Sequence, residues 1–140
     1  MSSDGLPENW RIQVFNDTGV ASGGDVEVTA QETKRDSDGT LEYNAEIVLR
    51  AAATLADQTH DESGTQDNSA AADLWTGLVG VLDANITTAT PDGNVELWFQ
   101  ASTDGGTTWP NHRGTLEGNC RLLTAINFTA TGQKISNWSL

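Results

Sequence analysis

Residues 93–110 read GNVELWFQASTDGGTTWP, and this segment contains the two strongest structural signals in the chain. In its first half, apolar and polar residues alternate. Alternation with a period of two places one set of side chains against a core and the other set on the opposite face of a β-strand. We therefore predict a strand over residues 95–101, with Val95, Leu97, Phe99 and Ala101 facing the core.

The second half of this segment matches the Asp-box pattern Ser-x-Asp-x-Gly-x-Thr-Trp and predicts a tight turn. A short Asp side chain can accept hydrogen bonds from the backbone of its own loop, and glycine adopts the positive φ values that such a corner needs. A tryptophan can cover the corner with a large apolar surface. Asp-boxes also occur in sialidases, but a propeller needs several blades and this chain has a single copy of the motif. The expected structural turn consists of Ser102, Asp104, Gly105, Gly106, Thr108 and Trp109.

Further strand patterns flank this segment on both sides, and Gly-rich turns separate them. A helix over residues 45–56 is an alternative to a strand there, because alanine favours helices, but alternation favours the strand. Seven to eight short strands of this kind predict an all-β fold, an antiparallel β-sandwich or a jelly-roll-like barrel. The expected strands cover residues 10–14, 26–30, 43–55, 74–82, 95–101, 122–128 and 135–140, with a hairpin turn at 36–39.

Two segments lack such patterns. Residues 1–9 are polar and contain Pro7, so we expect an N-terminal arm that is either frayed or clasps a neighbour, ahead of a single domain over residues 10–140. Residues 56–73 read ADQTHDESGTQDNSAAAD, with alanine as the only apolar residue. We expect a long polar loop, either a surface loop or an arm toward another subunit.

The strongly negative net charge argues against two classes of partner, nucleic acids and anionic membranes. Twenty Asp and Glu stand against seven Lys and Arg, which gives −13 over 140 residues. Nucleic acids and anionic membranes are recognised by basic residues, so we expect neither as a partner. Cys120 is the only cysteine and cannot form an internal disulfide bond. The N-terminus lacks a signal-peptide pattern, and no apolar run reaches the ~20 residues of a membrane-spanning helix.

No set of residues in the sequence predicts catalysis, a cofactor or a metal site. A zinc site needs three or four converging ligands, and His60, His112 and Cys120 do not have that spacing. Residues 36–42 resemble a calcium-binding loop but lack its full spacing, so a plain hairpin is expected. The remaining motifs are four Asn-x-Ser/Thr sequons, at Asn16, Asn85, Asn127 and Asn137, which would matter only in a glycosylating environment.

Five tryptophans suggest an interaction surface. Trp98 lies on the polar side of its predicted strand, and Trp138 shares a face with polar residues. Exposed aromatic side chains anchor protein interfaces. The alternative is that other parts of the sandwich cover both rings. The interface candidates are Trp98, Trp138, Trp75 and His60.

The order of elements over residues 93–140 resembles that of small β-sandwich structural proteins of tailed bacterial and archaeal viruses. The Gln-x-Ser-x-Asp-Gly-Gly-Thr-Thr-Trp-Pro segment at 100–110 carries this resemblance, together with the strands that follow it. It implies a non-enzymatic capsid decoration (cement) protein on the capsid surface. It also implies the major capsid protein or other virion proteins as partners, and a homo-oligomer such as a trimer. The acidic composition resembles that of proteins from halophilic hosts, where salt screens such charge.

Three other functions remain open at this level. A tail-tube or head–tail connector subunit would use the same sandwich. A carbohydrate-binding module would use Trp98, Trp109 or Trp138 as a platform for sugars. An enzyme is the weakest alternative, because nothing selects a pair of carboxylates among the twenty Asp and Glu residues.

Overall fold

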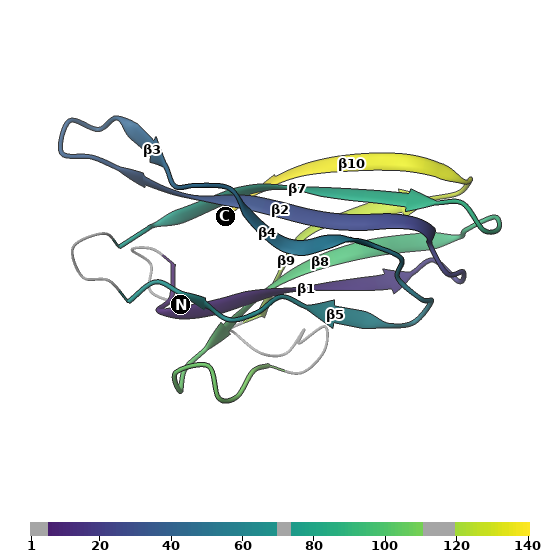
Figure 1. Ribbon diagram of the computed structural model, residues 1–140, viewed down its shortest axis with the longest axis horizontal. Coiled ribbons are helices and arrows are strands. Elements are labelled where there is room, and N and C mark those ends of the chain that lie inside the picture. The colour runs from purple at the N-terminus through teal and green to yellow at the C-terminus, as the bar shows by residue number, and fades with distance from the viewer. Residues whose placement is uncertain (1–5, 70–73, 111–119) are drawn as a thin grey trace.

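The computed structural model describes residues 6–69, 74–110 and 120–140, and this part of the chain is an all-β sandwich. Its strands form two antiparallel five-stranded sheets that pack face to face (Figure 1). The described residues contain no helix, so the strand interpretation of residues 47–53 is confirmed over the helical alternative.

The first sheet has the strand order β5-β1-β8-β9, and β6 also pairs with β1. Its central pair, β1 and β8, is in antiparallel register along the whole of β1, from Asn9 opposite Ser102 to Asp17 opposite Asn94. The strands are β1 (Asn9–Asp17), β5 (His60–Glu62), β6 (Gln66–Asp67), β8 (Gly93–Ser102) and β9 (Cys120–Phe128).

The second sheet has the strand order β10-β7-β2-β3, and β4 pairs with β2 on the same side as β3. The hairpin of β2 and β3 projects beyond the end of the first sheet, at the upper left of Figure 1. The strands are β2 (Gly23–Arg35), β3 (Leu41–Tyr43), β4 (Ile47–Ala53), β7 (Gly77–Ile86) and β10 (Gly132–Ser139).

The core lies between the sheets and follows the alternation of the sequence. Every second residue of β8, from Val95 to Ala101, is buried in one apolar cluster, as predicted. The inward residues of β1 belong to the same cluster, and the Trp10 and Phe99 rings stack with centroids 5.7 Å apart. Such a pair contributes roughly 0.5–1.5 kcal/mol beyond the burial of its area.

The prediction of a long polar loop over residues 56–73 is wrong in its central part. Residues 60–62 and 66–67 form the short strands β5 and β6, which extend the first sheet along the edge of β1. An acidic, non-periodic segment can form strands here because it pairs through backbone groups at a sheet edge and needs no apolar face of its own. Residues 70–73 lie outside the described part of the chain.

The N-terminal arm expected over residues 1–9 is also shorter than predicted. Leu6 is buried in the core, Glu8 accepts a hydrogen bond from the backbone of Asn68, and Asn9 already belongs to β1. Residues 6–9 are therefore part of the sandwich, and residues 1–5 are outside the described residues.

Candidate functional site

The centre of the outer face of the first sheet is covered, although most of its residues are polar. Gln13, Glu96 and Gln100 point away from the core and are nevertheless buried. Gln100 accepts a 2.8 Å hydrogen bond from Arg11 Nε, and the Arg11 guanidinium lies 4.4 Å from the centre of the Trp109 ring. Trp109, in the loop that follows β8, thus packs over the centre of this face, whereas Leu122, opposite Trp98 on the edge strand β9, is 45% exposed.

A hydrogen-bonded pair, His60 and Glu62, continues this polar face toward β5. His60 Nδ1 lies 2.6 Å from Glu62 Oε1, and Gln13 Nε2 donates to the same oxygen at 3.0 Å. Partial burial opposes ionisation of Glu62, but the hydrogen bond from Gln13 and the nearby His60 outweigh it and lower the pKa of Glu62. His60, an interface candidate, is exposed and bonded within its own chain.

The outer face of the second sheet is different, and we call it the bare face. On β2, Thr29 and Gln31 alternate with buried Ala30, so they point away from the core. Strand register places further outward residues in the same two rows, because paired residues lie on the same side of a sheet. These are Val79 and Val81 on β7, Asn137 and Ser139 on β10, and Val48 on β4.

Of the six large apolar side chains that are exposed among the described residues, four lie on the bare face; the other two are Leu74 and Leu122. Tyr43 is 55% exposed, Val48 56% and Ile135 60%, which are large fractions for residues of this size and polarity. Tyr43 pairs with Thr33 and Ile135 pairs with Asp83, so each continues a row of this same face. Leu41 shares it as well, opposite Arg35.

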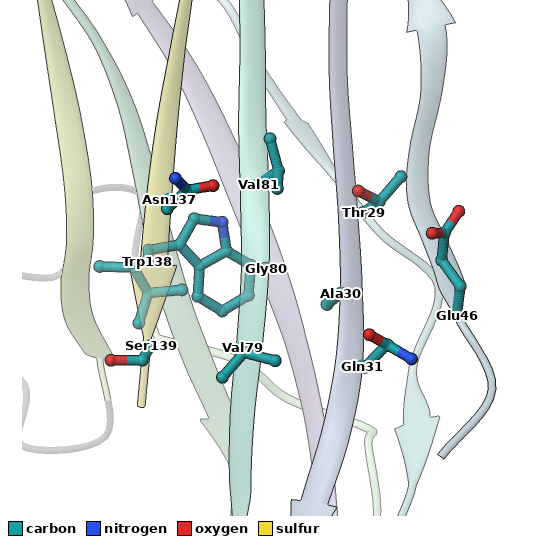
Figure 2. Close-up of a pocket in the computed structure, with 11 residues that line it drawn as sticks. Thr29, Ala30, Gln31, Glu46, Val79, Gly80, Val81, Asn137, Trp138 and Ser139 are labelled. Atoms are coloured by element: carbon teal, nitrogen blue, oxygen red, sulfur yellow. The ribbon is translucent and has the colours of Figure 1, made fainter. Parts of the chain in front are cut away.

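A shallow groove of about 660 Å³ crosses the bare face between the two central rows (Figure 2). Gly80 lies at its middle, and the indole of Trp138 reaches from β10 toward Gly80. A Cβ atom on Gly80 would overlap that ring, so glycine is required for the ring to lie there. The residues that line the groove are Thr29, Ala30, Gln31, Glu46, Val79, Gly80, Val81, Leu123, Asn137, Trp138 and Ser139.

One end of the bare face is acidic. Glu27 on β2 lies directly opposite Asp83 on β7, and both line a hollow of about 180 Å³ with Asp25 and Ala52. Like charges in directly opposed positions of a sheet destabilise it. The rows at the groove, in contrast, contain hydroxyl, amide and valine side chains, with Glu46 at one end.

Two of the predicted interface residues are not available as exposed anchors. Trp98 is 8% exposed and donates a 3.1 Å hydrogen bond to Glu96, and Trp138 is 6% exposed within the core cluster. The expectation of exposure is wrong for both, because neighbouring elements cover these rings, and neither can serve as a flat platform for sugars. Trp75 is half-buried against the core, with Lys34 Nζ 4.5 Å from the centre of its ring.

The Asp-box turn has the predicted geometry. Asp104 Oδ1 accepts hydrogen bonds from the backbone N–H groups of Thr107 and Thr108, and Oδ2 accepts one from the Thr108 hydroxyl at 2.6 Å. Gly105 and Gly106 have φ values of 74° and 88°. The Thr108 bonds lower the pKa of Asp104 to about 2. Every partner of this carboxylate is local, so the motif stabilises a turn.

The calcium-like segment is a hairpin turn. Asp36 Oδ1 accepts from the backbone of Asp38 and Thr40, and Gly39 has a φ of 82°. Among residues 6–69, 74–110 and 120–140, no three His, Cys, Asp or Glu side chains are placed to hold a metal ion. His112 falls outside these ranges.

One of the four sequons has a clear structural role. Asn16 is fully buried and donates from Nδ2 to the carbonyl oxygens of Val20 and Leu55. This asparagine holds the β1–β2 connection in place, so its amide is not accessible in the folded chain.

The residues of the bare face were missed by sequence reasoning, although a signal was present. Val79 and Val81 lie within one predicted apolar run with Leu78 and Leu82. Only the latter pair is fully buried. When consecutive residues of a strand are apolar, both faces of the sheet are apolar at that strand. The core covers one of these faces, and the other must be covered by something else.

Comparisons with known proteins add no relative to this description. In the part of the chain that the structure describes, no helix has the length and hydrophobicity needed to cross a membrane. No family model, no curated protein and no solved structure matches the chain.

Proposed function

We propose that this chain is a non-enzymatic structural protein of a virus particle, a capsid decoration protein that binds the outer surface of a tailed-virus head. The bare face is the observation that carries the proposal. The centre of one outer face of the sandwich is covered, with only Leu122 exposed among its large apolar residues in the described part of the chain, whereas the other face exposes several, such as Tyr43, Val48 and Ile135. Exposed apolar surface on one side of a stiff scaffold suits docking to another protein.

The resemblance over residues 93–140 gives the proposal its biological setting. On that basis the partners are the major capsid protein or other virion proteins, the chain acts as a homo-oligomer, and its place is the capsid surface. A decoration protein needs rigidity, and the Asp-box turn and the continuous apolar core supply it.

The acidic end of the bare face supports a salty working environment. Glu27 and Asp83 repel each other at low ionic strength, whereas at 1 M salt the Debye length falls to about 3 Å. Salt therefore stabilises this sheet, which agrees with the halophile-like composition.

The proposal is tested by the stoichiometry of the chain in purified particles. We expect quantitative mass spectrometry of the virus that encodes it to find hundreds of copies per particle, and recombinant chain to rebind particles stripped of it. Absence from the particles would refute the proposal. A few copies at the neck, or copies confined to tails, would instead support the connector or tail-tube alternative.

A further inference from the structure

We propose that the bare face binds an apolar patch of the capsid shell protein, and that this patch has lysine or arginine side chains at one end. The projecting hairpin of β2 and β3 contacts its other end. This inference rests on the docking role proposed above and names the chemistry of the partner surface. Three features support it: the orientation of the hairpin, the band of exposed apolar residues, and the distribution of charge along the face.

The hairpin turns its apolar side toward the bare face. Because it extends beyond the first sheet, strands of that sheet cover neither of its sides (Figure 1). The side chains of β2 that face the core are apolar as far as Ala30. At the hairpin the same side carries Lys34, whose Nζ lies 3.9 Å from Glu42 on β3, so this side pairs its own charges. The opposite side of β3 exposes Leu41 and Tyr43, so a partner that covers them approaches from the bare face.

A band of exposed apolar side chains crosses the bare face from this hairpin. Val48 on β4 and Ile135 on β10 lie on the two outer strands, which are about 14 Å apart at ~4.8 Å per strand spacing. Val79 and Val81 on β7 lie between them and line the shallow groove (Figure 2). A single exposed apolar residue is ordinary on a protein surface, whereas several on one face mark a surface that another protein covers.

The acidic end of the bare face forms no ion pair within the described part of the chain. No lysine, arginine or histidine described there pairs with Asp25, Glu27 or Asp83. Glu27 lies directly opposite Asp83, so the two carboxylates repel each other and lower the stability of the sheet. A lysine or arginine of a partner at this end would remove the repulsion and form charge-assisted hydrogen bonds.

The charge of the face also favours a shell protein over a second copy of this chain. Glu46 adds a further carboxylate at the edge of the groove, and Arg35 lies at the hairpin end. A second copy would bring another net charge of −13 to a face that is already negative, so the copies would repel each other. A surface with basic side chains complements this face, and complementary charge raises both specificity and the rate of association.

Rebinding of recombinant chain to particles stripped of it tests the inference, with variants compared in pairs. Ile135→Thr should weaken rebinding about tenfold, because the partner covers a side chain that is 60% exposed in the free chain. Leu122→Thr is the matched control: Leu122 is 45% exposed on the edge strand of the other sheet, so rebinding should not change. Tyr43→Thr should also weaken rebinding about tenfold, whereas Glu42→Gln, on the other side of β3, should not.

A carboxylate variant separates binding from folding. Glu27→Gln should weaken rebinding about fivefold at 0.15 M NaCl, because the basic side chain of the partner loses its carboxylate. The same variant should melt at a higher temperature than the wild-type chain in dilute buffer, since the repulsion from Asp83 is removed. Glu8→Gln is the matched control and should change neither result, because Glu8 is an exposed carboxylate next to β1 of the first sheet. Thermal melts of all variants establish that they are folded.

Where the wild-type chain rebinds, three results would overturn the inference and leave the proposed function standing. In the first, Ile135→Thr or Tyr43→Thr rebinds as tightly as its control. In the second, Glu27→Gln rebinds as tightly as Glu8→Gln. In the third, sedimentation equilibrium shows a wild-type dimer that Ile135→Thr abolishes, so that a second copy covers the face. Wild-type chain that fails to rebind would instead refute the proposed function, and the inference with it.

Discussion

Replacing Gly80 by alanine should destabilise the sandwich strongly for so small a change. A Cβ atom at this position would overlap Cζ2 of Trp138 and lie 2.5 Å from the carbonyl oxygen of Thr29. The ring could move, but the carbonyl belongs to the backbone of β2 and cannot give way without disturbing the sheet. Overpacking of this kind costs ~1–3 kcal/mol, and we take ~3 because a backbone atom is involved.

The replacement also has a favourable component. Alanine restricts the unfolded chain more than glycine does, which stabilises the folded state by ~0.4–1 kcal/mol. The net loss in free energy of unfolding is therefore about 2 kcal/mol. At ~2.1 cal/mol/K per residue, a chain of 140 residues has an unfolding entropy of about 0.3 kcal/mol/K, so Tm should fall by about 7 °C.

The assay is thermal unfolding followed by circular dichroism, with Gly64→Ala as the matched control. Gly64 has a φ outside the positive range, and a Cβ there would meet nothing within 4 Å, so its Tm should stay the same or rise slightly. If Gly80→Ala melts within a degree of Gly64→Ala, the packing of Trp138 against Gly80 is not what the structure indicates.

Three further substitutions test other parts of the structure. Asp104→Asn should lower Tm at pH 6. Hydrogen bonds hold the folded pKa of Asp104 at about 2, below its unfolded value of ~3.9, so the difference in Tm between the wild-type chain and the variant should shrink as pH falls from 4 toward 2. A difference in Tm that does not depend on pH would contradict this reasoning. Glu27→Gln removes a like charge opposite Asp83, so urea unfolding should show a gain of ~0.5 kcal/mol in dilute buffer that disappears in 1 M salt. Arg50→Gln should cost ~2 kcal/mol with little salt dependence, because the guanidinium binds three backbone carbonyls, whereas its partner Asp61 is half-exposed and adds little. A loss of stability that salt abolishes would show that the ion pair dominates.

Prediction from the sequence succeeded for strands in which every second residue is apolar. Residues 95–101 and 10–14 were predicted with the correct inward side chains, because alternation depends only on local geometry. The Asp-box turn was predicted for the same reason, since all partners of Asp104 lie within six residues of it.

It failed where burial depends on distant parts of the chain. Trp98 was expected to be exposed because Glu96 and Gln100 share its parity, but all three are covered on the outside of the first sheet. No local pattern shows that cover. Strands β5 and β6 were not predicted, for a related reason. They are only three and two residues long, and they form against the edge of β1, which lies some 50 residues earlier in the chain.

The pairing of β1 with β8 has a consequence for the making of the protein. Arg11 pairs with Gln100, 89 residues further along the chain. At about 5–20 residues per second, a ribosome needs roughly 4–18 s to synthesise the residues between them. During that interval the apolar side chains Trp10, Ile12 and Val14 lack β8 as a partner strand, so the nascent chain is prone to aggregation. We therefore expect co-expression of holdase chaperones, which cover these side chains during the interval, to raise the yield of native protein.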